Sequence, residues 1–440
     1  MFKVLSNKTY ARLLSAQIIA LLGTGLATVA LGLLAYEIAP QNAGAVLGTA
    51  LAIKMVAYVG IAPIATALAE RLPRKKVLIT LDLIRALVVL ALPFVTQVWQ
   101  VYVLIFVLQS ASAGFTPTFQ ATIPDVLPNE DDYTQALSLS RMAYDLESLI
   151  SPMLAAALLG VMSFSNLFVG TSIGFIASAC LVTLCVLPTA KAGAPRGFYE
   201  RTTRGLKIYL ATPRLRGLLA ITLCAAAASA MVLVNTVVIV QGNWGLTERD
   251  TAWALAAFGA GSMLAALVLP KLLHKVSDRN VMLGASTLLL VALLVSVWGL
   301  RSMPTLFAIW GTIGLAYGMA QTPSGRLLRR SAHAEDRPAV FAAHFALSHA
   351  CWLLTYLVAG HVGAALGITT AAACLAGLTV LGIAIAHGVW PAEKSGDVMH
   401  VHSNLDVSHE HWHAAPPSSS HELAHRHEYV IDDLHPHWPR

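Results

Sequence analysis

Long apolar segments dominate this chain, and each has the length of a helix that crosses a membrane. A helix of about 20 apolar residues covers a hydrocarbon core about 30 Å thick. Short polar loops separate the segments. The pattern predicts an all-α integral membrane protein with twelve transmembrane helices, at about 13–36, 44–69, 77–96, 99–122, 134–160, 165–187, 217–240, 251–273, 280–300, 304–325, 338–362 and 368–390.

One stretch rich in proline and positive charge interrupts this succession. Residues 188–217 hold seven Lys and Arg residues, with six apolar segments on either side. Two sets of six spans are typical of a transporter. The predicted parts are an N-terminal six-helix half (1–187), a cytoplasmic basic linker (188–217), a C-terminal six-helix half (218–390) and a disordered His-rich tail (391–440).

The two halves resemble each other in their loops. ERLPRKKVLI follows the second span and HKVSDRNVML follows the eighth; TPTFQATIPDVLPNEDD follows the fourth and TPSGRLLRRSAHAEDRP the tenth. The offset is roughly 205 residues, which fits parallel repeats related by an axis along the membrane normal. We therefore expect two pseudo-symmetric halves.

Positive charge predicts the orientation. Lys and Arg concentrate in alternate loops, in both terminal segments and in the linker, whereas the other set of loops holds only Arg249 and Arg301. Lys and Arg stay on the cytoplasmic side of a membrane. Both termini should be cytoplasmic, in a multi-pass protein of a bacterial inner membrane.

Composition supports the membrane assignment and excludes other classes. The chain has 12% charged residues, against about 25% in a soluble domain. Its net charge of +6 lies in short loops between spans, so we expect no nucleic-acid partner. Five cysteines lie inside apolar segments without disulfide or zinc spacing. We expect a monomer with protons, a transported ion and the bilayer as its partners.

The loop after the second span resembles that of the major facilitator superfamily. That family has the form G-x-x-x-D-R-x-G-R-K-K, and this chain keeps the charges but neither glycine; DLIRAL (82–87) and IPDVLP (123–128) look like its efflux branch. The resemblance implies alternating access, in which the loop charges stabilise one state. The alternative is a topology signal alone. The candidate gating residues are Glu70, Arg71, Arg74, Lys75, Lys76, Asp82 and Arg85.

A few ionisable residues lie within the spans, where each costs about 2.5–3.5 kcal/mol and needs a partner or a purpose. Asp82 and Arg85 are three residues apart on the third span, so we favour a structural ion pair. Lys54 lies halfway along the second span. We expect it to pair with a carboxylate of another helix.

The fifth span carries three charged residues. Arg141 and Asp145 are four residues apart and can neutralise each other. Asp145 and Glu147 point about 200° apart, which leaves Glu147 as the spare carboxylate. Its two interpretations are a cation or proton site and an interhelical hydrogen bond, and we include Glu147 and Asp145 among the candidates for proton coupling.

Two histidines on the eleventh span are further candidates. His344, Ser348, Cys351 and Thr355 form a polar stripe down one face, and His349 lies on another face. Imidazole binds borderline divalent metals and titrates near pH 6.5. A histidine on an apolar helix is also a common packing residue, so both interpretations of His344 and His349 stay open.

The tail after residue 390 changes composition abruptly. It has ten histidines and few aliphatic residues, so we expect disorder without a ligand. His-x-His occurs in four clusters, and in an extended chain residues i and i+2 project to the same side. We favour metal binding over a solvated tail. The candidate ligands are His400, His402, His409, His411, His413, His421, His425, His427, His435 and His437.

A body of this kind with a His-rich cytoplasmic tail resembles the NreB-type nickel-resistance exporters of bacteria. That resemblance implies export of Ni(II), and of Co(II), from the cytoplasm. We find no nucleotide-binding loop, cofactor motif or catalytic constellation, so we expect a proton antiporter and no enzyme. The alternatives are an efflux pump for organic molecules such as drugs or siderophores, with a regulatory tail, and a metal buffer that transports nothing.

Overall fold

The protein is almost entirely helical. The computed structural model describes residues 2–69, 72–187, 198–273, 275–333, 336–390, 397–401, 424–428, 430–431 and 438. Within these ranges, eleven helices are long and apolar enough to cross a membrane. The expected all-α membrane architecture is therefore confirmed. The predicted span 134–160 is the exception: α5 (Glu130–Leu158) is 29 residues long, but its polar residues keep it out of the apolar set.

The N-terminal half contains six long helices. Asn7 starts the first of them, since its side chain accepts from the backbone N–H groups of Thr9 and Tyr10. The elements are η1 (Phe2–Ser6), α1 (Lys8–Ile38), η2 (Pro40–Asn42), α2 (Ala43–Ala69), α3 (Arg74–Ala91), η3 (Leu92–Phe94), α4 (Val98–Val126), α5 (Glu130–Leu158) and α6 (Phe164–Thr183).

The C-terminal half has six further long helices, accompanied by short elements. Its elements are α7 (Phe198–Ala211), α8 (Pro213–Val237), the π-helix η4 (Val238–Asn243), α9 (Glu248–Leu273), α10 (Asp278–Gly299), α11 (Met303–Gln321), α12 (Ser324–Arg330), α13 (Arg337–Leu357), the π-helix η5 (Val358–Val362), α14 (Gly363–Leu366) and α15 (Ile368–Val389).

The same packing scheme occurs in both halves. In the first half α1 packs on α5 and α6, α2 on α4, and α3 on α4 and α6. In the second half α8 packs on α13 and α15, α9 on α11, and α10 on α11 and α15. Each pair of the first half recurs in the second when the helices α1, α2, α3, α4, α5 and α6 are matched, in this order, to α8, α9, α10, α11, α13 and α15. The two most extensive contacts between the halves, α5 with α9 and α13 with α2, are related in the same way.

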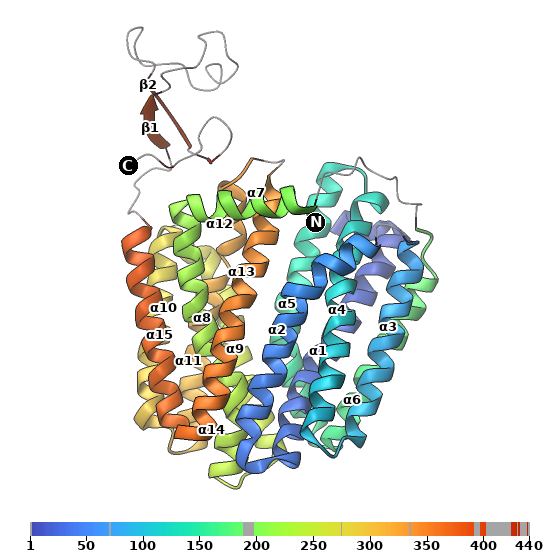
Figure 1. Ribbon diagram of the computed structural model, residues 1–440, viewed down its shortest axis with the longest axis vertical. Helices are drawn as coiled ribbons and strands as arrows, with labels where there is room; N and C mark the ends of the chain where they lie inside the picture. Colours follow the sequence, from blue (N-terminus) through green and yellow to red (C-terminus); the bar gives the residue numbers. More distant parts are fainter. Residues whose placement is uncertain are drawn as a thin grey trace.

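The halves stand side by side (Figure 1), and backbone contacts close one end between them. A Cβ atom on Gly48 of α2 would lie 2.5 Å from the carbonyl oxygen of Tyr356, and one on Gly360 would overlap the carbonyl oxygen of Gly44. Thr49 hydrogen-bonds His361 across the same contact at 3.1 Å. Small residues thus let the helices touch, as is usual in membranes. We call this end, near α14, the far end, and the opposite one, with α7 and α12, the terminal end.

Part of the predicted linker is a helix that belongs to the second half. We predicted a basic linker at 188–217; within it, α7 lies across the terminal end (Figure 1) and packs on α13. Arg204 donates two hydrogen bonds to Asp336, at 2.6 and 3.0 Å. The seventh span also begins at Pro213 instead of 217. Residues 188–197 lie outside the described ranges.

The prediction of a disordered tail is wrong for ten of its residues. Strands β1 (Asp397–Val401) and β2 (Ala424–Glu428) pair antiparallel, with His400 opposite His425. Hydrogen bonds between backbone groups do not need a hydrophobic core, and composition alone does not show them. Beyond β2, Ile431 is buried in a cluster with Tyr209 and Leu215 of the second half. Ile431 therefore packs on the terminal end of the helical body.

Two glycines offer a matched test of the packing in the second half. A Cβ on Gly314 of α11 would overlap the carbonyl oxygen of Phe258 on α9, whereas one on Gly284 of α10 meets nothing within 4 Å. We expect Gly314→Ala to lower stability by about 1–3 kcal/mol, since overpacking forces the helices apart. Gly284→Ala should unfold like the wild type. Thermal unfolding in detergent measures both, and equal midpoints would contradict the close contact of α9 and α11.

Candidate functional site

Lys54 and Glu147 lie close enough inside the first half for their opposite charges to interact, and we call them the charge pair. Lys54 lies midway along α2 and Glu147 in the second half of α5, and each feels the charge of the other. Both side chains are partly buried. An ionised group in the membrane interior is costly unless it has a partner. The structure thus identifies the partner that sequence reasoning expected for Lys54.

A glycine on α1 makes room for the carboxylate. A Cβ on Gly25 would lie 2.9 Å from Oε1 of Glu147 and would overlap the side chain of Ser151. Ser151 lies one turn further along α5 and donates to the carbonyl of Leu22 at 3.5 Å. The absence of a side chain at Gly25 therefore lets α5 press Glu147 against the backbone of α1.

The charge pair lies next to the boundary between the halves. Nζ of Lys54 is 6.0 Å from the ring centre of Tyr58, one turn along α2. Tyr58 stacks on His349 of α13, with ring centres 5.4 Å apart, and Lys54 also acts electrostatically on this histidine. Glu147, Lys54 and His349 thus form a series from α5 through α2 to the second half.

His349 belongs to an aromatic cluster on α13. Its ring lies 3.9 Å from that of Phe345 and 6.4 Å from that of Trp352. Its Nδ1 lies 2.7 Å from the carbonyl oxygen of Phe345. Trp352 donates to Ser229 of α8 at 3.1 Å. These contacts fix the imidazole as part of an aromatic wall that faces Tyr58.

His344, the other candidate on α13, has a different neighbour. Its Nδ1 lies 2.9 Å from the hydroxyl of Tyr209 on α7, and the two rings stack 5.8 Å apart. Burial raises the pKa of Tyr209 above its ordinary range, so the phenol keeps its proton and can donate it to Nδ1. His344 therefore connects α7 to α13 instead of facing Lys54.

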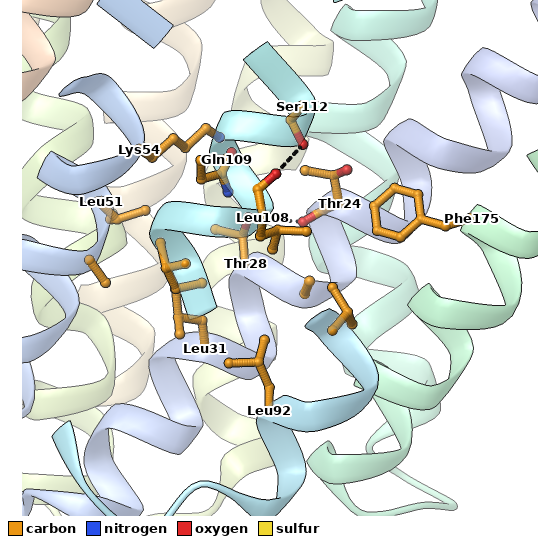
Figure 2. A pocket seen from close by; sticks show the side chains of 14 residues that line it. Thr24, Thr28, Leu31, Leu51, Lys54, Leu92, Leu108, Gln109, Ser112 and Phe175 are labelled. Carbon is orange, nitrogen blue, oxygen red and sulfur yellow. Dashed lines mark hydrogen bonds between the residues drawn. The ribbon is translucent and has the colours of Figure 1, made fainter. Parts of the chain in front are cut away.

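A cavity of about 20 Å³ adjoins Lys54. It lies between α1, α2 and α4, and Figure 2 shows Lys54, Gln109, Ser112, Thr24 and Thr28 around it. A water molecule needs at least about 10–15 Å³ of such volume, whereas drug-sized pockets are usually about 300–1,000 Å³. The cavity suits water and not an organic substrate.

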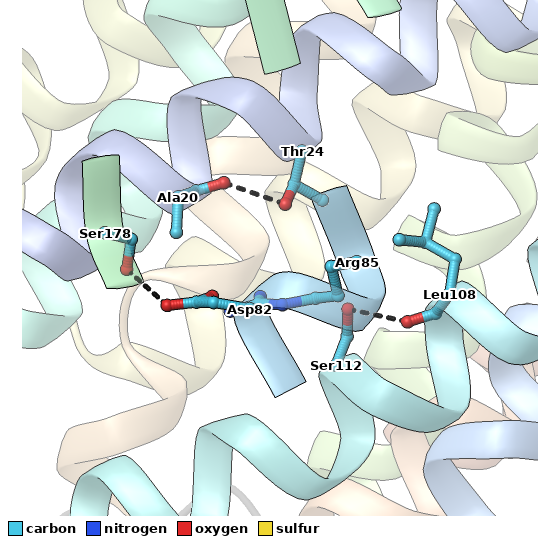
Figure 3. Close-up of polar contacts among 7 residues, drawn as sticks. All are labelled: Ala20, Thr24, Asp82, Arg85, Leu108, Ser112 and Ser178. Carbon is cyan, nitrogen blue, oxygen red and sulfur yellow. Dashed lines mark hydrogen bonds and ion pairs between the residues drawn. The ribbon is translucent and has the colours of Figure 1, made fainter. Parts of the chain in front are cut away.

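Asp82 and Arg85 form the ion pair that their spacing predicts. Both are buried, and Ser178 of α6 donates to the second carboxylate oxygen at 2.7 Å. The guanidinium lies between two rings, 4.0 Å from Phe115 and 4.4 Å from Phe175. Figure 3 shows the pair at the level of Thr24 and Ser112. We assign it a structural role within α3, α4 and α6.

Arg74 and Lys75, at the start of α3, make their polar contacts within the first half. Arg74 pairs with Asp125 at the end of α4, Lys75 donates to the carbonyl of Cys185 at 2.9 Å, and Lys76 is exposed. Glu70 and Arg71 lie outside the described residues, so their gating role stays a prediction.

The second half has an ion pair at the equivalent place with its charges reversed. Asp278 at the start of α10 accepts from Arg326, which follows α11, with 3.1 Å between Nε and Oδ2. In the first half, the cation starts α3 and the anion ends α4. At the terminal end, the first pair joins α3 to α4 and the second joins α10 to α12, the short helix that follows α11.

Metal ligands do not cluster in the part of the chain that the structure describes: no group of three or more His, Cys, Asp or Glu side chains lies together there. In the tail, only the backbones of His400, His425 and His427 are described, in β1 and β2. The other seven tail histidines, and the side chain of Asp145, lie outside the described part, so the metal and coupling roles predicted for them stay predictions.

A family model now identifies the architecture. The model of the Major Facilitator Superfamily matches residues 13–242 and, again, residues 218–400. The chain belongs to the Major Facilitator Superfamily. Membership makes it a transporter and not an enzyme, and the double match corresponds to the repeated packing scheme of the halves.

Curated relatives of this Major Facilitator Superfamily chain are distant. An uncharacterized MFS-type transporter, YfiS of Bacillus subtilis, is 25% identical over 296 residues, which are 64% of this chain and 69% of the relative. Macrolide efflux protein A of Streptococcus pyogenes is 26% identical over 152 residues, 32% of this chain and 37% of the relative. The second match thus spans about a third of each protein.

Solved structures share the Major Facilitator Superfamily fold. A mutant of the nucleoside transporter NupG has a TM-score of 0.69 at 15% identity, and the match covers 86% of this chain and 100% of the NupG chain. A bacterial homolog of the human lysosomal transporter Spinster, inward-facing and unoccupied, has a TM-score of 0.68 at 12% identity, covering 88% and 99%. Identities this low show the fold alone.

Sequence reasoning missed several residues of this Major Facilitator Superfamily site. Gly25 and Tyr58 contribute because of what they face on other helices, which no local pattern shows. Thr24 and Ser112 did leave a signal, since small hydroxyl residues inside apolar spans often satisfy backbone carbonyls or line polar interiors. Both donate to the carbonyl four residues earlier, at 2.9 and 3.0 Å.

A double-mutant cycle tests the charge pair. Lys54→Met or Glu147→Leu leaves one charge without its partner and should cost about 1–3 kcal/mol, less than a fully enclosed pair because the neighbouring cavity can hydrate it. The double variant should recover most of that loss. Thermal unfolding of the four proteins gives the coupling, and strictly additive effects would contradict the pair.

Proposed function

We propose that this chain is a proton-coupled exporter of a bacterial inner membrane. The observation that carries the proposal is the Lys54–Glu147 charge pair beside the boundary of the halves. A carboxylate in a span that pairs with a lysine is a group whose protonation changes the local charge balance. The distribution of Lys and Arg supports a cytoplasmic terminal end. The closed far end then faces away from the cytoplasm.

Proton exchange at Glu147 can drive the cycle. Without its proton, Glu147 neutralises Lys54; with its proton, Glu147 leaves the lysine charge uncompensated next to Tyr58 and His349. The two states therefore differ in charge at the surface between the halves. A proton shifts the equilibrium between two conformations only if its binding free energy differs between them, and this change in charge can supply the difference. Protons moving inward down their gradient would return the empty transporter to its loading state.

A small organic molecule is the substrate that the surroundings favour. The boundary beside Lys54 is lined by Tyr58, Phe345, His349 and Trp352, and aromatic surfaces with a few polar groups are typical of sites for organic ligands. The Streptococcus pyogenes relative carries macrolide efflux in its name, so macrolides are the first class to test.

Replacing one carboxylate tests the coupling. Glu147→Gln keeps the shape of the side chain but cannot release a proton, so efflux of a macrolide such as erythromycin from energised cells should fall to the background of cells without the gene. Asp132→Asn, at the start of the same helix α5, is the control and should export like the wild type. Substantial export by a Glu147→Gln protein that reaches the membrane would overturn the role of Glu147.

Export of a divalent transition metal is the second candidate, and the tail favours it. Ten histidines without a nearby cysteine suit Ni(II), Co(II), Zn(II) or Cu(II). The register of β1 and β2 brings the segment around His400 beside that around His425 and His427. A cytoplasmic tail of this kind would raise the local metal concentration at the loading side. It ranks second because the described interior has no cluster of metal ligands.

Tail variants separate the two candidates. If metal is the substrate, deleting 391–440 should weaken tolerance of nickel or cobalt salts without abolishing it. Deletion also removes Ile431 and Trp438, which contact the body. A variant with the ten tail histidines replaced by glutamine keeps both and should show the same partial loss in growth assays. Complete loss of tolerance in the tail variants would contradict a loading role for the tail. Unchanged tolerance in these variants, together with lost macrolide export in Glu147→Gln, would reject metal as the substrate.

A further inference from the structure

A second cavity lies next to the one at Lys54, inside the first half. It has a volume of about 40 Å³, room for at least two water molecules. Arg85, Tyr58, Gln17 and Thr116 are among its lining residues. Thr24 and Ser112 line both cavities, so the two are neighbours that meet at this pair of hydroxyl side chains.

The two cavities follow one another along α1 and α4, which run antiparallel, so residue numbers rise along α1 and fall along α4. Along α1 the cavity at Arg85 is lined by Gln17 to Thr24 and the cavity at Lys54 by Thr24 to Leu31; along α4 the order runs from Phe119 through Ser112 to Ile105. From Gln17 to Leu31 α1 rises by about 21 Å. The two cavities therefore cover much of the membrane thickness within one half.

Three buried polar groups on these linings have no protein partner among the side chains that the structure describes. They are Oε1 of Gln109 at the first cavity, and Nε of Arg85 and Nε2 of Gln17 at the second. Buried polar groups nearly always find a partner, and ordered water is the usual one in a polar cavity of this size. Thr24 and Ser112 donate to their own helices and keep lone pairs that can accept from water.

We propose that the two cavities hold a chain of water molecules through which Glu147 exchanges its proton with the terminal side of the first half. The chain starts at Arg85 and Gln17, passes between Thr24 and Ser112 (Figure 3), and reaches Lys54 (Figure 2). Glu147 lies against Gly25, the residue that follows Thr24 on α1. The Asp82–Arg85 pair fixes the Arg85 Nε–H at its outer part. Thr24 and Ser112 are positioning residues, because they hold water and take no permanent charge.

This route would separate the proton from the substrate. Phe345, His349 and Trp352 lie on α13 at the boundary between the halves, whereas both cavities lie among α1, α2, α3, α4 and α6. Lys54 and Tyr58 of α2 stand between the two regions. A proton could then leave Glu147 while a substrate still occupies the boundary. The inference rests on the proposed role of Glu147 as the coupling carboxylate.

Infrared spectroscopy after a pH jump tests the route on the full chain in lipid and needs no substrate. The carboxylic acid band that Glu147→Gln removes reports the proton on Glu147. We expect Thr24→Val/Ser112→Ala to slow the appearance of this band about tenfold. Such a change corresponds to a barrier to proton transfer that is higher by about the free energy of one or two hydrogen bonds. The pH midpoint of the band should not change. Ser112→Ala alone should give a smaller slowing and serves if the double variant does not fold.

The matched control is Thr287→Val/Ser296→Ala in the second half. Thr287 and Ser296 also donate to the carbonyl four residues earlier, at 3.0 and 2.8 Å, but line neither cavity. This variant should protonate Glu147 at the wild-type rate. A wild-type rate in both the double and the single cavity variant would overturn the water chain and leave the proposed function intact. A carboxylic acid band that persists in Glu147→Gln would overturn the proposed function itself.

Discussion

The Lys54–Glu147 charge pair is the interaction on which the rest of the site depends. Two opposite charges within membrane-spanning helices stabilise each other, and this attraction acts between α2 and α5. Gly25 allows the approach because a side chain there would meet both Glu147 and Ser151. Loss of the negative charge by protonation changes the forces on α2, the helix that also contacts α13.

The architecture gives that local change a path to the whole molecule. The α2 helix touches the second half through Tyr58 near the middle and through Gly44 and Gly48 at the far end. Within each half, an ion pair at the terminal end joins two helices, Arg74 of α3 with Asp125 of α4 and, reversed, Asp278 of α10 with Arg326 of α12. Rigid halves that meet through α2 and α13, and through α5 and α9, can rock about those contacts.

Much of the fold and part of the site were predictable from sequence. Segment length and apolarity predict the helices, because burial of backbone polar groups leaves few other solutions in a bilayer. Helical spacing marked Glu147 as the spare carboxylate and correctly paired Asp82 with Arg85. It could not show that Lys54 faces Glu147, since the rotation of α2 against α5 depends on packing. His344 was on a predicted polar stripe, but its neighbour Tyr209 belongs to a helix within the supposed linker.

Proton release on substrate binding is the most direct measure of the central claim. Purified protein in weakly buffered detergent solution would be mixed with saturating erythromycin while a pH-sensitive dye records the medium. For Ni(II), both the wild type and Glu147→Gln would carry glutamine in place of the ten tail histidines, because metal binding to histidine releases protons by itself. We predict release of protons on binding of the true substrate by the wild type and none by Glu147→Gln that still binds it. Equal release by both proteins, or tight binding to the wild type with no release at any pH, would contradict proton exchange at Glu147.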